Sequence, residues 1–225
     1  MSSLPALERR RRRALERGRV PAPLLPLLSR PWPRASQDVR DVRFLAVDLE
    51  TTGLDPETDR ILSIGWVPVE EGRIRLGRAG YAVVRHEEVA RTEAVLVHGL
   101  TREVLARGAP LETVLAALMP ELAGSVLVAH ESSIERGFLG RACERAWGLR
   151  PEVPVLDTVR VERSLASFRR ESRDLRLPAL RERYRLPPHR AHHALSDAVA
   201  AAEVMLCQWR EISGSRTTRL RRVLV

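Results

Sequence analysis

The sequence contains no lysine and no asparagine, only two cysteines and few aromatic residues. All 38 basic residues are therefore arginine, a bias that a GC-rich gene would also produce, so arginine content alone does not establish phosphate binding. Cys143 and Cys207 are far apart and lack the C-x-x-C spacing of a zinc or redox motif. Two cysteines are also too few for a disulfide framework. No apolar run approaches the roughly 20 residues of a membrane span. We expect a cytoplasmic protein without a membrane segment.

The positive charge is concentrated at the two ends of the 225-residue chain, whose formal net charge is +9. Residues 1–43 carry 11 arginines against 4 acidic residues, and residues 208–225 carry 5 against 1. The middle, 44–207, holds 22 arginines against 24 acidic residues, with one locally basic stretch at 158–191. Nucleic acid is a reasonable first partner to test, and the ends would add salt-sensitive, non-specific affinity.

Composition shifts divide the sequence into three segments. Residues 1–41 are a basic, proline-rich N-terminal extension, 42–209 the folded domain, and 210–225 a basic C-terminal tail. Five prolines between positions 21 and 33 predict that this part of the extension lacks regular structure.

Apolar periodicity within 42–209 predicts alternating strands and helices. We expect strands over 44–47, 60–69, 74–84, 126–129 and 153–156, and helices over 111–122, 132–147 and 191–209. The short links between the first three strands indicate an antiparallel meander. The order predicts an α/β fold with a mixed five-stranded sheet and helices on both faces.

A pair of acidic residues lies at the end of the first strand. Asp48 and Glu50 are two apart, so both project from one face, while Leu49 points into the core. Two close carboxylates repel each other unless a cation lies between them, and hard cations such as Mg²⁺ or Mn²⁺ take oxygen ligands. On this evidence alone, a pair of solvated charges at a strand end is the favoured interpretation, because D-x-E is a common sequence.

Four segments together resemble the signatures of the DEDD exonucleases, the DnaQ-like family with an RNase H-like fold. They are D-L-E-T-T-G-L at 48–54, V-H-G-L-T at 97–101, V-A-H-E-S-S-I-E-R-G-F-L at 128–139 and H-H-A-L-S-D-A at 192–198. The last resembles the histidine-bearing DEDDh version. The resemblance covers about residues 44–209 and is closest to the DNA polymerase III epsilon-like branch.

The resemblance implies a role for each matching residue. Two divalent metal ions, Mg²⁺ or Mn²⁺, would be held by Asp48, Glu50, Glu135 and Asp197. His192 would be the general base that deprotonates the attacking water, a task that suits imidazole near neutral pH. Because His192 and Asp197 are five apart, they do not share a helical face, and we expect His192 on the loop entering the helix.

Further matches concern substrate binding. The segment that cradles the 3′-terminal nucleotide in the family is matched by Thr51, Thr52, Gly53 and Leu54. Gly53 also suits a tight turn with positive φ. His98 and His130 belong to matched segments, although histidines with structural hydrogen bonds are an equal alternative. We expect His193 to be exposed and His189 to be a plain loop residue, with a phosphate contact as the alternative for His189.

The second signature departs from the family pattern. Glu131 stands where the family has Asn, and Ile134-Glu135 stands where it has Phe-Asp. Glu135 is one methylene longer than aspartate and could reach a metal directly or through water. Glu131 adds a charge beside the substrate cleft and could substitute as a ligand.

These expectations combine into one functional hypothesis. The protein would be a 3′→5′ exonuclease that removes nucleoside monophosphates from single-stranded DNA 3′ ends in proofreading or repair, with a polymerase as a possible partner. One alternative is an RNA-trimming exoribonuclease of the same superfamily. Another is a catalytically weakened nucleic-acid-binding or polymerase-docking module.

Overall fold

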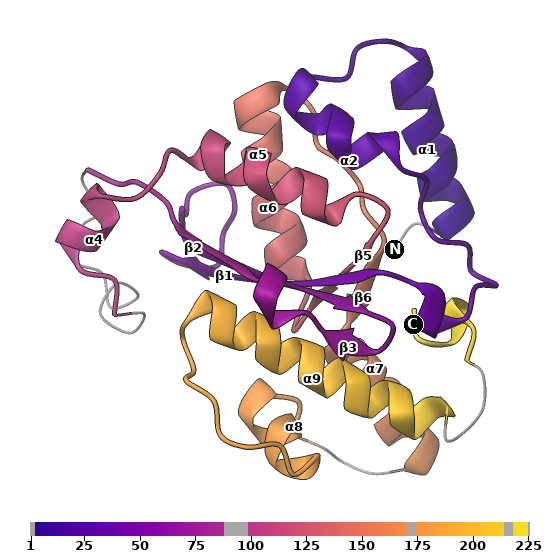
Figure 1. Ribbon diagram of the computed structural model, residues 1–225. Coiled ribbons are helices and arrows are strands. Elements are labelled where there is room, and N and C mark those ends of the chain that lie inside the picture. The colour runs from indigo at the N-terminus through magenta and orange to yellow at the C-terminus, as the bar shows by residue number, and fades with distance from the viewer. Residues whose placement is uncertain (1–2, 88–98, 171–173, 214–217, 225) are drawn as a thin grey trace.

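A computed structural model describes residues 3–87, 99–170, 174–213 and 218–224. One sheet lies between two layers of helices, with α5, α6 and the N-terminal helices on one face and α7, α8 and α9 on the other (Figure 1). This confirms the predicted α/β architecture with helices on both faces. Among the described residues, no helix combines the length and apolar character that crossing a membrane requires.

The sheet is mixed and runs in the order β3-β2-β1-β5-β6, with β4 also pairing with β2. Its strands are β1 (Phe44–Thr51), β2 (Ile61–Glu70), β3 (Arg73–Ile74), β4 (Gly80–Val83), β5 (Val126–Ala129) and β6 (Val155–Asp157). The pairs β1–β2, β2–β3 and β2–β4 are antiparallel, which confirms the meander. Strands β1, β5 and β6 run parallel, joined by helical crossovers.

The helices close the two faces of the sheet. They are α1 (Leu4–Glu16), α2 (Leu25–Ser29), α4 (Arg102–Ala106), α5 (Leu111–Leu122), α6 (Ser133–Trp147), α7 (Thr158–Arg169), α8 (Leu177–Arg183) and α9 (Ala194–Ser213). Helix α6 ends at Gly148, whose φ of 71° is the left-handed conformation that glycine tolerates at a helix C-terminus.

Side chains along β1 alternate between two cores, as a strand period of two requires. Leu45, Val47 and Leu49 pack toward α5 and α6, whereas Phe44 and Ala46 pack toward α9. The even-numbered positions that follow, 48 and 50, therefore face α9. The hydrophobic pattern of one strand thus decides which helix its two carboxylates will meet.

Two details differ from the sequence-based expectation. The strand predicted over 74–84 is divided into β3 and β4 by a turn at Leu76–Arg78, so the sheet has six strands. The proline-rich stretch was predicted to lack regular structure, and that is wrong for α2. Pro26 lies in the first turn of α2, where a missing N–H costs little, and Leu27 and Leu28 are buried against the core.

The three-segment division stays a proposal. Leu7 of the N-terminal segment belongs to the core on the α5 side of the sheet. Leu220 of the C-terminal segment belongs to the core on the α9 side, and its N–H donates to the carbonyl of Gln37. Both ends of the chain therefore pack against the central segment.

Candidate active site

Three carboxylates meet between β1 and the first turn of α9. Asp48 and Glu50 share one face of β1, as predicted, and Asp197 approaches them from the helix above that face. One carboxylate oxygen from each of the three lies within 4.8 Å of the others. Leu49 points to the opposite face and is buried there, which confirms its predicted direction. Residues nearly 150 positions apart thus form one acidic cluster.

A fourth carboxylate enters from the other side of the sheet. Glu135 lies in the first turn of α6, is only 2% exposed, and is outside the trio defined by mutual distances below 4.8 Å among the described residues. Its Oε2 atom is buried without a hydrogen-bond partner among the described residues. An acceptor oxygen in that position is suited to a ligand that supplies positive charge.

The electrostatics of the cluster favour a bound cation. Burial raises the pKa of Asp48 well above its ordinary value, and the negative charges of Glu135, Asp197 and Glu50 raise it further. Burial likewise raises the pKa of Glu135, from 4.5 to about 8. Removing four carboxylates from water without a counter-charge is costly, and a divalent cation would offset that cost. The donor set, all hard oxygen atoms, fits Mg²⁺ or Mn²⁺.

Asp197 is held by the loop that precedes its helix. Its Oδ1 atom lies 2.8 Å from Nε2 of His189, and its Oδ2 atom accepts the backbone N–H of His193 at 3.0 Å. His189 was expected to be a simple loop residue, and the structure instead places its ring against a predicted metal ligand. Sequence spacing could not show this, since the loop between them is irregular.

His192 lies on the loop entering α9, as its five-residue spacing from Asp197 predicts. It is exposed, and its φ of 62° is an uncommon left-handed conformation for a non-glycine residue. His193 was expected to be exposed, and that is wrong. It is half-buried, and its ring stacks on Tyr81 with centroids 4.5 Å apart and an interplanar angle of 19°. The stack on Tyr81 holds the side chain of His193 in place, directly after His192 in the loop.

Asp157 is a buried residue of the site region that sequence reasoning missed. Its carboxylate accepts the N–H of Glu131 and both the N–H and hydroxyl of Ser132, at 3.3, 3.0 and 2.9 Å. It also caps α7 by accepting the N–H of Val159 at 2.9 Å. Asp157 thereby connects the start of α7 with the turn before α6. Helix α6 carries Glu135 in its first turn. An aspartate directly before a helical pattern was the available signal.

Glu131 occupies the turn that Asp157 holds. Its φ is 68° and its side chain is exposed. Nearby, Nδ1 of His130 lies 2.8 Å from the hydroxyl of Thr158, and burial lowers the pKa of His130. That hydrogen bond supports the structural interpretation of His130. His98 lies outside the described residues.

The predicted nucleotide-binding segment follows β1. The Thr51 hydroxyl donates to the Gly53 carbonyl at 2.5 Å, and the Thr52 hydroxyl lies 3.0 Å from the Asp59 carboxylate. A Cβ on Gly53 would come within 2.4 Å of that carboxylate, so close approach rather than positive φ requires the glycine there. Leu54 is 76% exposed. Leu54 follows Glu50 by four residues, and so large an exposed apolar side chain is a candidate contact surface.

Comparisons with known proteins agree with this geometry. The sequence model of the exonuclease family, described as "Exonuclease" (RNase_T), matches residues 45–205. A PolC-type DNA polymerase III of Thermotoga petrophila is 34% identical over 163 residues, which cover 72% of this chain and 12% of that protein. A putative bifunctional exonuclease/endonuclease protein of Mycobacterium tuberculosis is 32% identical over 183 residues, or 77% of this chain and 27% of that protein. The chain thus spans a small part of the length of these relatives.

Solved structures show the same fold at lower identity. Exonuclease I superimposes with a TM-score of 0.64 and 18% identity, covering 81% of this chain and 42% of that one. Cell-death related nuclease 4 gives a TM-score of 0.64 and 15% identity, covering 76% and 65%. Both likenesses show the RNase H-like fold. The family match across residues 45–205 and the 34% identity to a PolC-type polymerase show that the chain belongs to the DnaQ-like DEDD exonuclease superfamily.

Proposed function

We propose that the protein is a 3′→5′ exonuclease that hydrolyses single-stranded DNA with two divalent metal ions. The observation that carries the proposal is the approach of Asp48, Glu50 and Asp197 to within 4.8 Å of one another. In a protein without a cation partner such an arrangement would be strongly unfavourable. With Glu135 as the fourth carboxylate, these residues would hold the metal ions.

Each residue of the site would have a separate role in the reaction. Bound at the cluster, the metal ions would lower the pKa of an attacking water and stabilise the leaving 3′ oxygen. His192, on a solvent-accessible loop beside Asp197, would take the proton from that water. Leu54 would contact the terminal base, and Thr51 and Gly53 would keep the backbone of that segment in place. The product would be a nucleoside monophosphate.

DNA is the polymer that we favour as the substrate, and the similar proteins suggest a role in DNA replication or repair. Matching relatives are PolC-type DNA polymerases, and Exonuclease I of E. coli, a structural neighbour, has been solved in complex with a 5cy-dT13 oligonucleotide. A role in proofreading or repair, with a polymerase as a partner, is part of the proposal. RNA trimming is the competing substrate choice and is a separate arm of the test.

The test uses 5′-labelled single-stranded DNA and RNA of the same sequence with Mg²⁺ or Mn²⁺. A 3′→5′ exonuclease produces a ladder of progressively shorter labelled products and releases mononucleotides. We expect the ladder with DNA, and we expect Asp48→Asn and Asp197→Asn to slow it at least 10²-fold. Asp174→Asn is the matched control, because Asp174 is an exposed carboxylate that pairs with Arg176 and is outside the trio of carboxylates. If the protein shortens RNA faster than DNA, RNA is the preferred substrate and the DNA assignment is wrong.

The outcome that sinks the proposal is equally definite. If the unaltered protein degrades neither polymer faster than Asp197→Asn does, the exonuclease proposal fails. Isothermal titration with Mn²⁺ gives a second readout, because Asp48→Asn and Asp197→Asn should weaken metal binding while Asp174→Asn should not.

A further inference from the structure

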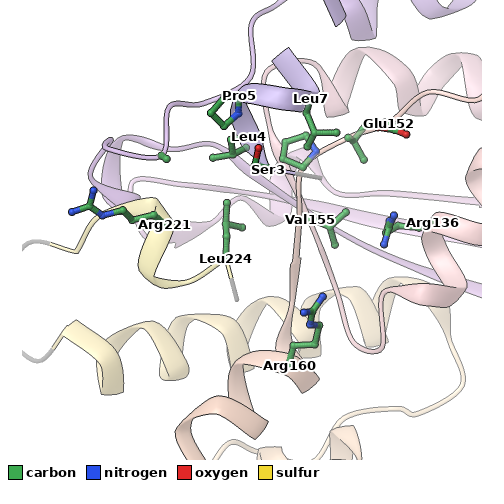
Figure 2. A pocket seen from close by; sticks show the side chains of 13 residues that line it. Ser3, Leu4, Pro5, Leu7, Arg136, Glu152, Val155, Arg160, Arg221 and Leu224 are labelled. Atoms are coloured by element: carbon green, nitrogen blue, oxygen red, sulfur yellow. The ribbon is translucent and has the colours of Figure 1, made fainter. Parts of the chain in front are cut away.

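Three adjoining hollows form a groove over α7. The first has a volume of about 400 Å³ and lies at the open edge of β6. Its lining combines Arg136, Arg160 and Arg221 with apolar side chains of α1, β6 and the C-terminal segment (Figure 2). The second, of about 510 Å³, shares Arg160 and is lined further along α7 by Arg163 and Phe168. The third, of about 280 Å³, shares Ser164 and Phe168 with the second and reaches Arg222.

We call this surface the α7 groove, and define it by Arg136, Arg160, Arg163, Ser164, Phe168, Arg221 and Arg222. Five of these seven residues are arginines. Within the described parts of the chain, none of the five has an ion pair. The one acidic residue that lines the first hollow, Glu152, is paired with Arg10.

Several other arginines of α7 and of the segment that follows it do pair with acidic residues. Arg169 on the same helix pairs with Glu211, Arg176 with Asp174, and Arg181 with Glu203. Five guanidinium groups that have no acidic partner among the described residues create a local positive field. That field fits a polyanion that can contact several arginines along one groove.

Phe168 gives the groove an aromatic surface. Its side chain is 89% exposed, more than any other large hydrophobic side chain described. It lies near the end of α7 beside Arg163 and Ser164 in the same hollow. Exposed aromatic rings flanked by basic residues are how proteins without sequence preference bind single strands, since every base has a face that can stack.

We propose that the α7 groove binds single-stranded nucleic acid, with arginines on successive phosphates and Phe168 stacked on a base. This inference rests on the proposed function, because the strand in the groove would be the part upstream of the 3′ end. The groove begins next in sequence to two residues of the site region, Glu135 and Asp157. Arg136 directly follows Glu135 on α6, and Arg160 lies three residues after Asp157. A single strand leaving the cluster could therefore enter the groove beside β6.

The first test measures binding of labelled single-stranded DNA by fluorescence anisotropy, in the Asp197→Asn background so that the strand is not degraded. Arg160→Ala combined with Arg163→Ala should raise the Kd of a strand of about 16 nucleotides roughly tenfold at physiological salt. The slope of log K against log salt should fall by about 1.4, since each lost phosphate contact removes about 0.7. The loss should be smaller for a strand of about 4 nucleotides.

The matched control carries the same change in charge elsewhere. Arg19→Ala combined with Arg73→Ala removes two exposed arginines outside the groove, and we expect a change in Kd of less than twofold. Equal losses of DNA affinity in the two double variants would show that net charge alone sets the affinity. That result would overturn the proposal that the α7 groove binds the strand.

The second test concerns the stacking residue. Phe168→Ala should raise the Kd about fivefold or more, and Phe168→Trp should restore it, because base stacking needs only a flat ring. Leu76→Ala is the control for losing an exposed apolar side chain, since Leu76 is 64% exposed outside the groove. Equal binding by Phe168→Ala and Phe168→Trp would contradict the role of the ring.

A further arm distinguishes nucleic acid from an acidic protein partner. Polyglutamate should displace the DNA only at a much higher concentration of charges, and tighter binding of polyglutamate would overturn the proposal. The two proposals fail separately. If Asp197-dependent hydrolysis persists while the groove variants bind like the control, only the groove fails. If the groove binds DNA but no Asp197-dependent hydrolysis occurs, only the proposed activity fails.

Discussion

Gly65 of β2 lies directly against Ala194 at the start of α9. A Cβ built on Gly65 would lie 2.3 Å from the carbonyl carbon of Ala194 and 2.2 Å from the backbone nitrogen of Leu195. Gly65 is also the cross-strand partner of Asp48. The absence of a side chain at Gly65 therefore lets the first turn of α9 approach the sheet where Asp48 projects, and Asp197 meets Asp48 for that reason.

Substituting Gly65→Ala should separate these two elements. We expect a loss of about 1–3 kcal/mol in the free energy of unfolding, because a methyl group would have to displace backbone atoms. A displacement of about 1 Å at Asp197 should lower kcat about 100-fold. Urea denaturation and steady-state hydrolysis measure the two effects. Gly77→Ala, at a position with nothing within 4 Å of the added methyl, is the control and should change neither.

The loop before α9 leads to a prediction about proton transfer. His192→Ala should lower the single-turnover hydrolysis rate about 10²- to 10⁴-fold, the range for loss of a general base. The loss of thermal stability should be small, because the side chain of His192 is exposed. His193→Ala should cost less than tenfold, since Asp197 accepts the backbone N–H of that residue rather than its ring. A larger loss from His193→Ala than from His192→Ala would reverse the assignment.

Asp157 should matter for stability and, indirectly, for activity. Asp157→Ala removes the cap of α7 and the acceptor of the turn at Glu131 and Ser132. We expect a loss of about 3 kcal/mol, since a helix cap and charge-assisted hydrogen bonds disappear together. Activity should fall as well, because the turn precedes the helix that carries Glu135. Chemical denaturation measures the first effect, and an Asp157→Ala protein as stable as wild type would contradict it.

The buried carboxylate of Glu135 makes the metal-free protein sensitive to pH. Its pKa is 4.5 when unperturbed and about 8 in the fold, so the folded state retains a proton that the unfolded state loses. The stability that this group contributes is therefore fully present below about pH 4.5 and falls as the pH rises toward 8, with no further loss from this group above that. A thermal melt series in chelator checks this. In the Glu135→Gln protein the melting temperature should fall less steeply with rising pH. In the unaltered protein Mn²⁺ should raise the melting temperature most at high pH.

If the melting temperature of the Glu135→Gln protein falls with pH as steeply as that of wild type, Glu135 is not the responsible group. Asp48, whose pKa is also raised, would then account for the dependence. The corresponding Asp48→Asn melt series separates the two contributions.

Local patterns were sufficient to predict most of the elements. The alternation along β1 placed Asp48 and Glu50 on one face, and the spacing of His192 and Asp197 placed the histidine on the loop before α9. These features depend on a strand period of two and a helix period of 3.6, which are properties of short segments. The prediction for α2 was wrong because Pro26 lies in a first turn, where the usual penalty for proline does not apply.

The sequence by itself determined the residue types of the site, their order and the elements that carry them. Only the tertiary structure decided which of them meet. Asp48 and Asp197 come together through Gly65, His189 reaches Asp197 across an irregular loop, and the arginines of the α7 groove converge from α6, α7 and the C-terminal segment. Such contacts depend on packing between elements distant in sequence, and no local periodicity records them.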